Sequence, residues 1–153
     1  MYYMSVEELK ALMPSVFTSN ELNSIGWSEY TLEDLEAILG RSEGFIDSLR
    51  YKGQFKEQYQ MHAFPRKLNT GYVVEKDDER IKKALCYVVY DTLKSLRTID
   101  PITGETPEDI IRQGIKSINT GGVSVSYGAI DEIKEVSQNY VKYLGFCLFK
   151  GIL

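Results

Sequence analysis

The chain has 153 residues, of which 43% are hydrophobic, a content that supports the core of one domain and excludes an intrinsically disordered protein. Its formal net charge is −4, from 22 acidic and 18 basic residues, which argues against a protein whose main task is to neutralise nucleic-acid phosphates. The longest apolar stretch has about half of the ~20 residues that cross a bilayer, so we expect no membrane span.

The N-terminal region has the signals of a short helix. Ser5 and Glu8 form the sequence pattern of a capping box, in which each side chain accepts a backbone N–H of the other residue. Apolar residues follow at helical spacing, namely Val6, Leu9, Leu12 and Met13. The predicted helix ends near Pro14, and residues 19–30 have the composition of a connection.

A longer helix is predicted next, with Thr31 as its N-cap and an end near residue 51. Its expected apolar side consists of Leu32, Leu35, Ile38, Leu39, Ile46 and Leu49. Gly40 and Gly44 each cost about 1 kcal/mol relative to alanine inside a helix, so we expect a kink or a break at these positions.

The clearest helix lies over residues 77–97. Its apolar face is formed by Ile81, Ala84, Leu85, Val88, Val89, Leu93 and Leu96, which identifies a core helix. Acidic residues at its start (Asp77, Asp78, Glu79) and basic residues at its end (Lys94, Arg97) complement the helix dipole. Tyr87 and Tyr90 are placed beside the apolar face.

The C-terminal third mixes helical and extended signals. Thr106 is a candidate N-cap of a short helix that ends near Gly114. Residues 118–128 alternate apolar and polar side chains between glycines, as an extended arm or hairpin does. A last helix is predicted over residues 130–144, and an apolar tail follows over residues 145–153.

Together these elements predict a mainly α fold, a small helical bundle of about four to five helices with one extended arm or hairpin. No internal repeat or linker divides the sequence, so we expect a single domain over residues 1–153.

Residue types that carry catalysis or bind metals are scarce. His62 is the only histidine, so a Ser or Cys nucleophile would have a single candidate imidazole base. Cys86 and Cys147 lie far apart without metal-ligand spacing, which disfavours a zinc site and favours a reducing, cytoplasmic setting. No phosphate-binding glycine motif is present. We therefore expect no metal, no cofactor and no enzymatic activity.

The stretch QMHAFPRKLNTG has no regular apolar period and contains the step Phe64-Pro65-Arg66. Proline favours an extended conformation of the residue before it, so we expect Phe64 to enter an apolar groove while Arg66 projects elsewhere. These three residues are interpreted as a structural anchor of the loop, with Arg66 paired to Asp47. For His62 two interpretations stay open, a half-exposed loop residue and a pH-sensitive contact.

With its surroundings, this stretch resembles the head-tail connector proteins of long-tailed bacteriophages, also called adaptor or head-completion proteins. The resemblance rests on an ordered series of short motifs that touches most of the chain. The motifs are Tyr3 and Ser5 to Glu8, Phe45-Ile46-Asp47, Gly53 and Phe55, Gln60, Phe64-Pro65-Arg66, Ile81-Lys82-Lys83-Ala84, and the segment from Ile115 to Gly128.

The resemblance implies a virion structural protein whose subunits form a homo-oligomeric ring, commonly twelvefold, in the neck between capsid and tail. Its partners would be the portal protein and a stopper or tail-completion protein, and it would be made in the host cytoplasm. The ring would extend the DNA channel. A weakly acidic chain without a basic stripe suits a lumen through which DNA passes without sequence-specific binding.

Two segments are candidates for the contacts of such a ring. The alternating arm, with Val123, Val125 and Tyr127, is predicted to contact the neighbouring subunit together with Tyr87 and Tyr90; the alternative is a hairpin on its own subunit. The apolar tail is predicted to contact the portal through Phe146, Leu148, Phe149, Ile152 and Leu153; the alternative is packing on its own bundle.

A different class of function is a single-stranded DNA-binding module of the DnaT-like kind, because aromatic side chains stack on bases. The basic residues Lys52, Lys56, Arg66 and Lys67 surround the aromatic residues Tyr51, Phe55 and Tyr59 in sequence. The overall acidic charge argues against this alternative. A small enzyme with a pocket of carboxylates and tyrosines ranks last.

Overall fold

The computed structural model describes residues 2–97 and 139–149 of the chain. Its elements in chain order are α1 (Val6–Val16), α2 (Ser19–Ser24), the 3-10 helix η1 (Trp27–Glu29), α3 (Leu32–Ser48), β1 (Gln54–Phe55), β2 (Arg66–Lys67), β3 (Val73–Val74), α4 (Glu79–Arg97) and α7 (Val141–Leu144). The described part is therefore mainly helical with one small sheet, which confirms the predicted fold class. The predicted helix after Thr106, the arm over residues 118–128 and residues 130–138 of the last helix lie outside the described residues.

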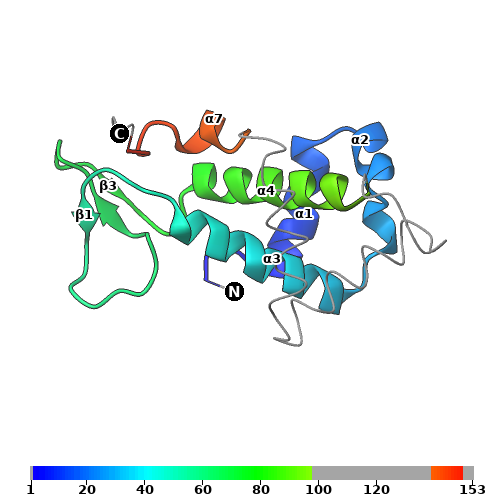
Figure 1. The fold of residues 1–153 in the computed structure, drawn as a ribbon, viewed down its shortest axis with the longest axis horizontal. Coiled ribbons are helices and arrows are strands. Elements are labelled where there is room, and N and C mark those ends of the chain that lie inside the picture. The colour runs from blue at the N-terminus through cyan, green and yellow to red at the C-terminus, as the bar shows by residue number, and fades with distance from the viewer. Residues whose placement is uncertain (1, 98–138, 150–153) are drawn as a thin grey trace.

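The two long helices α3 and α4 lie side by side and run in opposite directions (Figure 1). Helix α1 packs against both of them, and the short α7 packs against α4. The small sheet lies at one end of this body, where α3 ends and α4 begins. Helix α2 and the start of α3 lie at the opposite end (Figure 1). The molecule thus has a sheet end and an α2 end.

Capping boxes begin the first three α-helices. They pair Ser5 with Glu8, Thr18 with Glu21, and Thr31 with Asp34, and in each pair both reciprocal hydrogen bonds are present. The first and third starts agree with the sequence prediction. The second corrects it, because residues 19–30 were predicted as a connection and contain α2 and η1.

Two helices continue through residues that were expected to interrupt them. Pro14 lies inside α1, which runs to Val16 because the Phe17 N–H still bonds to the Met13 carbonyl at 3.0 Å. Helix α3 runs unbroken through Gly40 and Gly44, so the predicted kink is wrong. Packing accounts for this, since most of the expected apolar side of α3 is buried: Leu35, Ile38, Leu39 and Ile46. Leu32, at its start, is exposed instead.

Helix α4 is the central core helix, as its apolar periodicity predicts. Its buried residues include Ile81, Ala84, Leu85, Val89, Leu93 and Leu96. Tyr90 corrects the sequence interpretation, because it is only 7% exposed and its ring stacks on Phe17 at 4.3 Å between centroids. Tyr87 is half-buried, in edge contact with Phe17 and tilted against Tyr143. Packing against the Phe17 ring therefore makes Tyr90 part of the buried face of α4.

The sheet is antiparallel with the strand order β1-β2-β3. Gln54 pairs with Lys67, and Arg66 pairs with Val74. Gly53 has a φ of 78° just before β1, and a Cβ at this position would lie 2.1 Å from the Lys67 carbonyl oxygen. The strands are two residues long, too short for an alternating pattern, which explains why the sequence did not predict them.

Candidate interaction site

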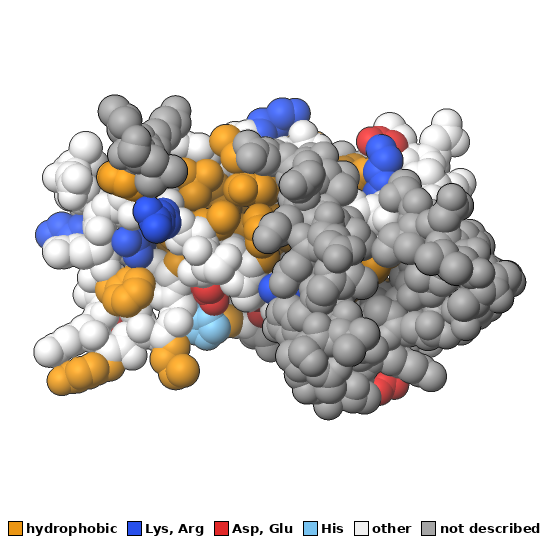
Figure 2. Space-filling view, in the orientation of Figure 1, with side chains coloured by type: hydrophobic (Ala, Val, Ile, Leu, Met, Phe, Trp, Pro, Cys, Tyr) orange, Lys and Arg blue, Asp and Glu red, His pale blue; other side chains and the backbone are white. Residues whose placement is uncertain are grey.

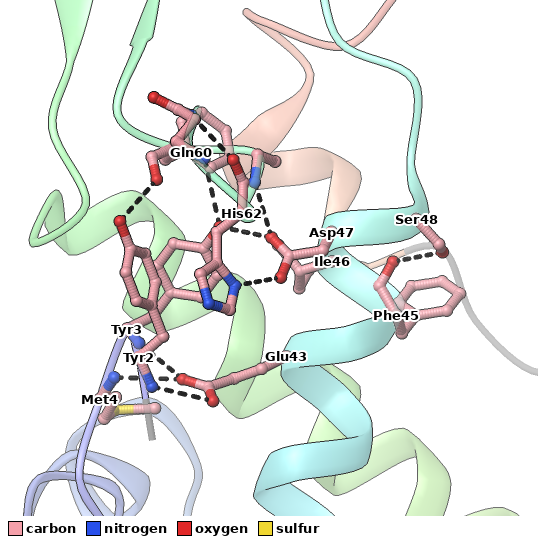
Figure 3. A network of polar contacts seen from close by, with 12 residues as sticks. Tyr2, Tyr3, Met4, Glu43, Phe45, Ile46, Asp47, Ser48, Gln60 and His62 are labelled. Carbon is pink, nitrogen blue, oxygen red and sulfur yellow. Dashed lines mark hydrogen bonds and ion pairs between the residues drawn. The ribbon is translucent and has the colours of Figure 1, made fainter. Parts of the chain in front are cut away.

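The polar centre of the sheet end is Asp47, near the end of α3. Its carboxylate accepts hydrogen bonds from the Tyr3 hydroxyl at 2.5 Å and from the Ala63 backbone N–H at 2.9 Å. Its other oxygen lies 2.7 Å from Nδ1 of His62 (Figure 3). One side chain of α3 therefore joins the N-terminal segment to the loop between β1 and β2.

Glu43, one helical turn before Asp47, fixes the same N-terminal segment. Its carboxylate accepts the backbone N–H groups of Tyr2, Tyr3 and Met4 at 3.2, 2.6 and 3.3 Å (Figure 3). Glu43 is buried, and these N–H donors compensate for the loss of water around its charge. The i, i+4 spacing places both carboxylates on one face of α3.

His62 contacts both Asp47 and the N-terminal Tyr2. Its ring stacks on the Tyr2 ring with centroids 3.7 Å apart, and the Tyr2 hydroxyl donates to the Phe64 carbonyl at 3.0 Å. The His62 side chain is 36% exposed, so the half-exposed interpretation agrees with the structure. Its contact with Asp47 is charged only when the imidazole is protonated, and pH sensitivity stays a prediction.

Tyr3 and Tyr51 are buried and pack against the loop between β1 and β2. Burial, reinforced by the hydrogen bond to Asp47, raises the pKa of the Tyr3 hydroxyl far above its usual value. Burial likewise raises the pKa of Tyr51. Tyr3 therefore stays protonated and remains a donor to Asp47 at any physiological pH. Both tyrosine rings make edge contacts with Phe64.

The Phe64-Pro65-Arg66 step lies between the core and the sheet. Phe64 is fully buried, Pro65 is buried, and the peptide bond between them is cis. The Arg66 guanidinium donates to the backbone carbonyls of Tyr51, Lys52 and Gly53 at 3.3, 2.6 and 3.2 Å.

The expected pairing of Arg66 with Asp47 is wrong. Asp47 is occupied by Tyr3, His62 and Ala63, and Arg66 binds carbonyl groups instead. Partial burial lowers the pKa of Arg66, although the group stays charged. Arg66 thus brings a positive charge to the sheet end that no carboxylate among the described residues neutralises in an ion pair.

The C-terminal tail lies along the segment that leads into β1. The Phe149 N–H donates to the Arg50 carbonyl at 2.9 Å, the Lys52 N–H donates to the Cys147 carbonyl at 2.8 Å, and Leu148 forms an antiparallel bridge with Tyr51. Cys147 is fully buried. Residues up to Phe149 are therefore docked on their own subunit by backbone hydrogen bonds.

The tail residues predicted to contact the portal differ in exposure. Phe146 is half-buried under the Arg80 guanidinium, which lies 3.9 Å from the ring centroid, and Leu148 is half-buried. Phe149 is 56% exposed. Ile152 and Leu153 lie outside the described residues, as do the arm residues Val123, Val125 and Tyr127.

A cavity of about 410 Å³ opens between the tail, the end of α3 and the β1–β2 loop. It is lined by Asp47, Leu49, Arg50, Tyr51, Phe55, Met61, His62, Ala63, Arg66 and Phe149. Hydrophobic and basic side chains gather on this end of the molecule (Figure 2). The cavity therefore combines an apolar wall with two guanidinium groups and the Asp47 carboxylate, which suits a ligand with both apolar and polar parts.

We call this cavity and its rim the sheet-end surface. The exposed large hydrophobic residues that line it are Phe55, Met61 and Phe149, and Met61 is 92% exposed. No group of three or more His, Cys, Asp or Glu side chains within residues 2–97 and 139–149 is arranged to hold a metal ion. In the same part of the chain, no helix combines the length and apolar character needed to cross a membrane.

Sequence reasoning singled out the loop but not the residues that hold it. Tyr2 lies about 40 residues before Glu43 and Asp47, so no local pattern joins the N-terminal segment to α3. The i, i+4 spacing of Glu43 and Asp47 on the apolar side of a helix was the available signal, because buried carboxylates need partners. Compared with known proteins, the chain matches no protein-family model, no curated protein and no solved structure.

Proposed function

We propose that the chain is an adaptor subunit of a phage head-tail connector, forming a ring between the portal protein and a stopper or tail-completion protein in the virion neck. The observation that carries this proposal is the sheet-end surface, to which the tail contributes the exposed Phe149. The order of the connector-like motifs in the sequence gives the proposal its particular partners.

The exposure of this surface has no explanation within the described part of the subunit. Phe55, Met61 and Phe149, which line the cavity, are 48%, 92% and 56% exposed. Single exposed hydrophobic residues are ordinary, but several around one cavity mark an interaction site. An assembly protein needs such a surface in each subunit.

The tail fits the role of a portal contact. Its backbone is fixed to residues 50–52, so the Phe149 ring is presented from a defined position instead of a free chain end. A fixed side chain loses less conformational entropy on binding than a mobile one. In this proposal Ile152 and Leu153 continue the same contact, and Phe146 and Leu148 support it from below.

Charge supports the proposed position on a DNA channel. A subunit with a net charge of −4 has little non-specific affinity for phosphates, so DNA would slide through a ring of such subunits.

The test is particle mass by light scattering together with negative-stain imaging, for the protein alone and mixed with a phage portal. Rings stacked on the portal are expected. A Phe149→Ser variant should lose portal binding while keeping its helical content. Tyr72→Ser, which removes a similarly exposed aromatic residue that does not line the cavity, is the matched control for that contact. A protein that stays monomeric and ignores the portal would contradict the adaptor function.

A single-stranded DNA-binding module is the second candidate. It is favoured by the placement of Arg50 and Arg66 in one cavity with the exposed Phe55 ring, since cations and aromatic faces together bind nucleotides. Charge reversal of Lys52 and Lys67 separates the two candidates. Loss of oligonucleotide binding with portal-bound rings intact would favour the DNA-binding module.

A further inference from the structure

The cavity of the sheet-end surface has a small excess of positive charge in its own lining. The sheet end as a whole is nearly balanced, since residues 41–80 contain eight basic and seven acidic side chains. Of these, Asp47, Arg50 and Arg66 line the cavity. With a neutral His62, the described lining therefore has one net positive charge. What the cavity can bind depends on which of these charged groups is still free.

Two of the three charged groups are already bonded within the fold. The Asp47 carboxylate accepts the Tyr3 hydroxyl and the Ala63 N–H, and its second oxygen contacts an imidazole nitrogen. The Arg66 guanidinium donates to the backbone carbonyls of residues 51–53 and, at 3.5 Å, to that of Ala63. Both groups hold the wall of the cavity in place, so neither needs a partner from another molecule.

Arg50 is the exception among these groups. Its side chain is exposed, and within residues 2–97 and 139–149 it forms no hydrogen bond and no ion pair. Its backbone is nevertheless fixed between α3 and β1, because the Arg50 carbonyl accepts the Phe149 N–H at 2.9 Å. A guanidinium can form two parallel hydrogen bonds to one carboxylate. The lining therefore contains one free cation with directional donors.

Apolar side chains from three segments share the cavity with this cation. Phe55 comes from β1, Met61 from the loop between β1 and β2, and Phe149 from the tail, and all three are exposed. The volume of about 410 Å³ is at the lower end of the range of ligand pockets, ~300–1,000 Å³, so it suits one or two large side chains better than a large cofactor. The flexible Met61 side chain can adapt to the shape of such an occupant.

We propose that this cavity binds a peptide segment of a partner protein, in which a large apolar side chain enters the cavity and a neighbouring carboxylate pairs with Arg50. The apolar side chain contacts Met61 and Phe149, and Arg50 selects the acidic residue. Binding energy at protein interfaces concentrates in aromatic and arginine anchors of this kind. The inference rests on the proposed function, in which the sheet-end surface contacts the portal, and it adds the chemistry of the segment that is recognised there.

A protein segment fits the cavity better than a nucleic acid does. Nucleic acids are held by a series of cations along the backbone, whereas the described lining has Arg50 as its one free cation and includes the Asp47 carboxylate, which repels phosphates. The Arg66 guanidinium already lies over the Phe55 ring, 5.4 Å from its centroid, so one face of that ring is not open to a base. Nucleic acid therefore becomes an outcome of the test.

The test is the selection of binders for the full chain from a library of random peptides displayed on yeast. Peptides selected by the wild type should share a large apolar residue close to an Asp or Glu. Arg50→Glu should select Lys or Arg in place of the acidic residue. Lys67→Glu, which reverses an exposed charge outside the cavity, is the matched control and should select the wild-type motif.

Calorimetry with the most enriched wild-type peptide measures the two parts of the site. Binding should be at least about tenfold weaker for Arg50→Glu, because a charge-assisted pair is lost. Met61→Ser should also weaken binding, whereas Leu32→Ser, which removes an exposed apolar residue that does not line the cavity, should not. Circular dichroism checks that each variant keeps its helical content.

Two results would overturn the inference: no shared motif among the wild-type peptides, or an acidic residue that persists in the peptides selected by Arg50→Glu. If no motif emerges and the chain instead binds single-stranded oligothymidine through Arg50 and Lys67, the occupant is nucleic acid and the inference is also wrong.

Portal binding separates this inference from the proposed function. Equal portal binding by the wild type and Arg50→Glu would leave the adaptor function intact and reject the role of Arg50. A wild type that ignores the portal but selects the acidic motif would reject the adaptor function and support the peptide site.

Discussion

Asp47 Oδ2 lies 2.7 Å from Nδ1 of His62, and through this contact the end of α3 holds the loop that forms one wall of the cavity. The same carboxylate accepts the Tyr3 hydroxyl and the Ala63 N–H. Three segments that are distant in sequence are joined by one acidic side chain, so the shape of the sheet-end surface depends on Asp47.

Replacing Asp47 by alanine should therefore lower the free energy of unfolding by about 2–4 kcal/mol, because hydrogen bonds to a charged group are each worth about 1.5–3 kcal/mol and two buried donors lose their acceptor. Urea unfolding followed by circular dichroism measures the change. Glu36→Ala, on the exposed side of the same helix, should change stability by less than about 0.5 kcal/mol. Equal effects of the two substitutions would show that Asp47 does not hold the loop.

Asp78 gives a prediction about pH. Its carboxylate accepts the Arg80 guanidinium at 2.8 Å and the Arg80 backbone N–H at 2.8 Å, next to the start of α4. The guanidinium contact is the main cause of a lowered pKa of Asp78. A lowered folded-state pKa contributes stability above the unfolded value of about 3.9 and loses it as pH falls through the folded value.

Asp78→Ala should accordingly be less stable than the wild type at pH 7 by about 1 kcal/mol, the usual cost of losing a side chain that accepts a backbone N–H in the first turn of a helix. The difference should shrink as the pH falls below about 4, because the Asp78 carboxylate of the unfolded chain is protonated before that of the folded protein. Urea unfolding at a series of pH values measures both curves, with Asp77→Ala as the neighbouring control. A difference that stays constant down to pH 2 would contradict the assigned role of the charge.

The buried thiols allow a test of the tail. Burial raises the pKa of Cys86 to about 12 and that of Cys147 to about 11, so both should react slowly with a disulfide reagent in the native protein at pH 8. Cys147 is held by the docked tail and Cys86 by α4, in the centre of the core. If the tail detaches independently, Cys147 should react first. Mass spectrometry of the modified residues identifies the order, and equal rates would show that the tail unfolds with the core.

The helix starts and the central helix were predictable from sequence because their causes are local. A capping box needs residues three positions apart, and the core face of α4 repeats every turn. The same local rule was available for Thr18 and Glu21, but the Ser, Asn and Gly content of residues 19–30 led to the prediction of a connection.

The sheet end was not predictable in the same way. The Tyr3–Asp47 hydrogen bond joins residues 44 positions apart, and the β1–β2 loop is ordered by such contacts instead of by a repeating pattern. Arg66 shows the limit of sequence-based prediction. Its charge suggested a carboxylate partner, whereas its guanidinium binds the three consecutive backbone carbonyls of residues 51–53.

Leu144 in α7 and Phe149 in the tail should separate interaction from folding. Leu144 is fully buried, and Leu144→Ala should lower the free energy of unfolding by about 2–5 kcal/mol. Phe149 is mostly exposed, and Phe149→Ser should change stability by about 0.5 kcal/mol or less while weakening assembly. Chemical unfolding and light scattering on both variants measure the two effects. Comparable destabilisation by both substitutions would identify Phe149 as a core residue and remove it from the proposed interface.

Two glycines distinguish a steric collision from backbone strain. Gly53 and Gly71 both have positive φ values, 78° and 89°, so alanine is strained at either position, at a cost of about 1–2 kcal/mol. A Cβ at residue 71 meets nothing within 4 Å, whereas at residue 53 it lies 2.1 Å from the Lys67 carbonyl oxygen. Gly53→Ala must therefore also separate β1 from β2. We expect urea unfolding to give a clearly larger loss of stability for Gly53→Ala than for Gly71→Ala.

Because the Gly53 carbonyl also accepts a hydrogen bond from the Arg66 guanidinium, Gly53→Ala should also disturb the cavity and weaken portal binding, whereas Gly71→Ala should not. Equal losses for the two variants would mean that the strands separate at little cost and that the cavity wall is not built on their pairing.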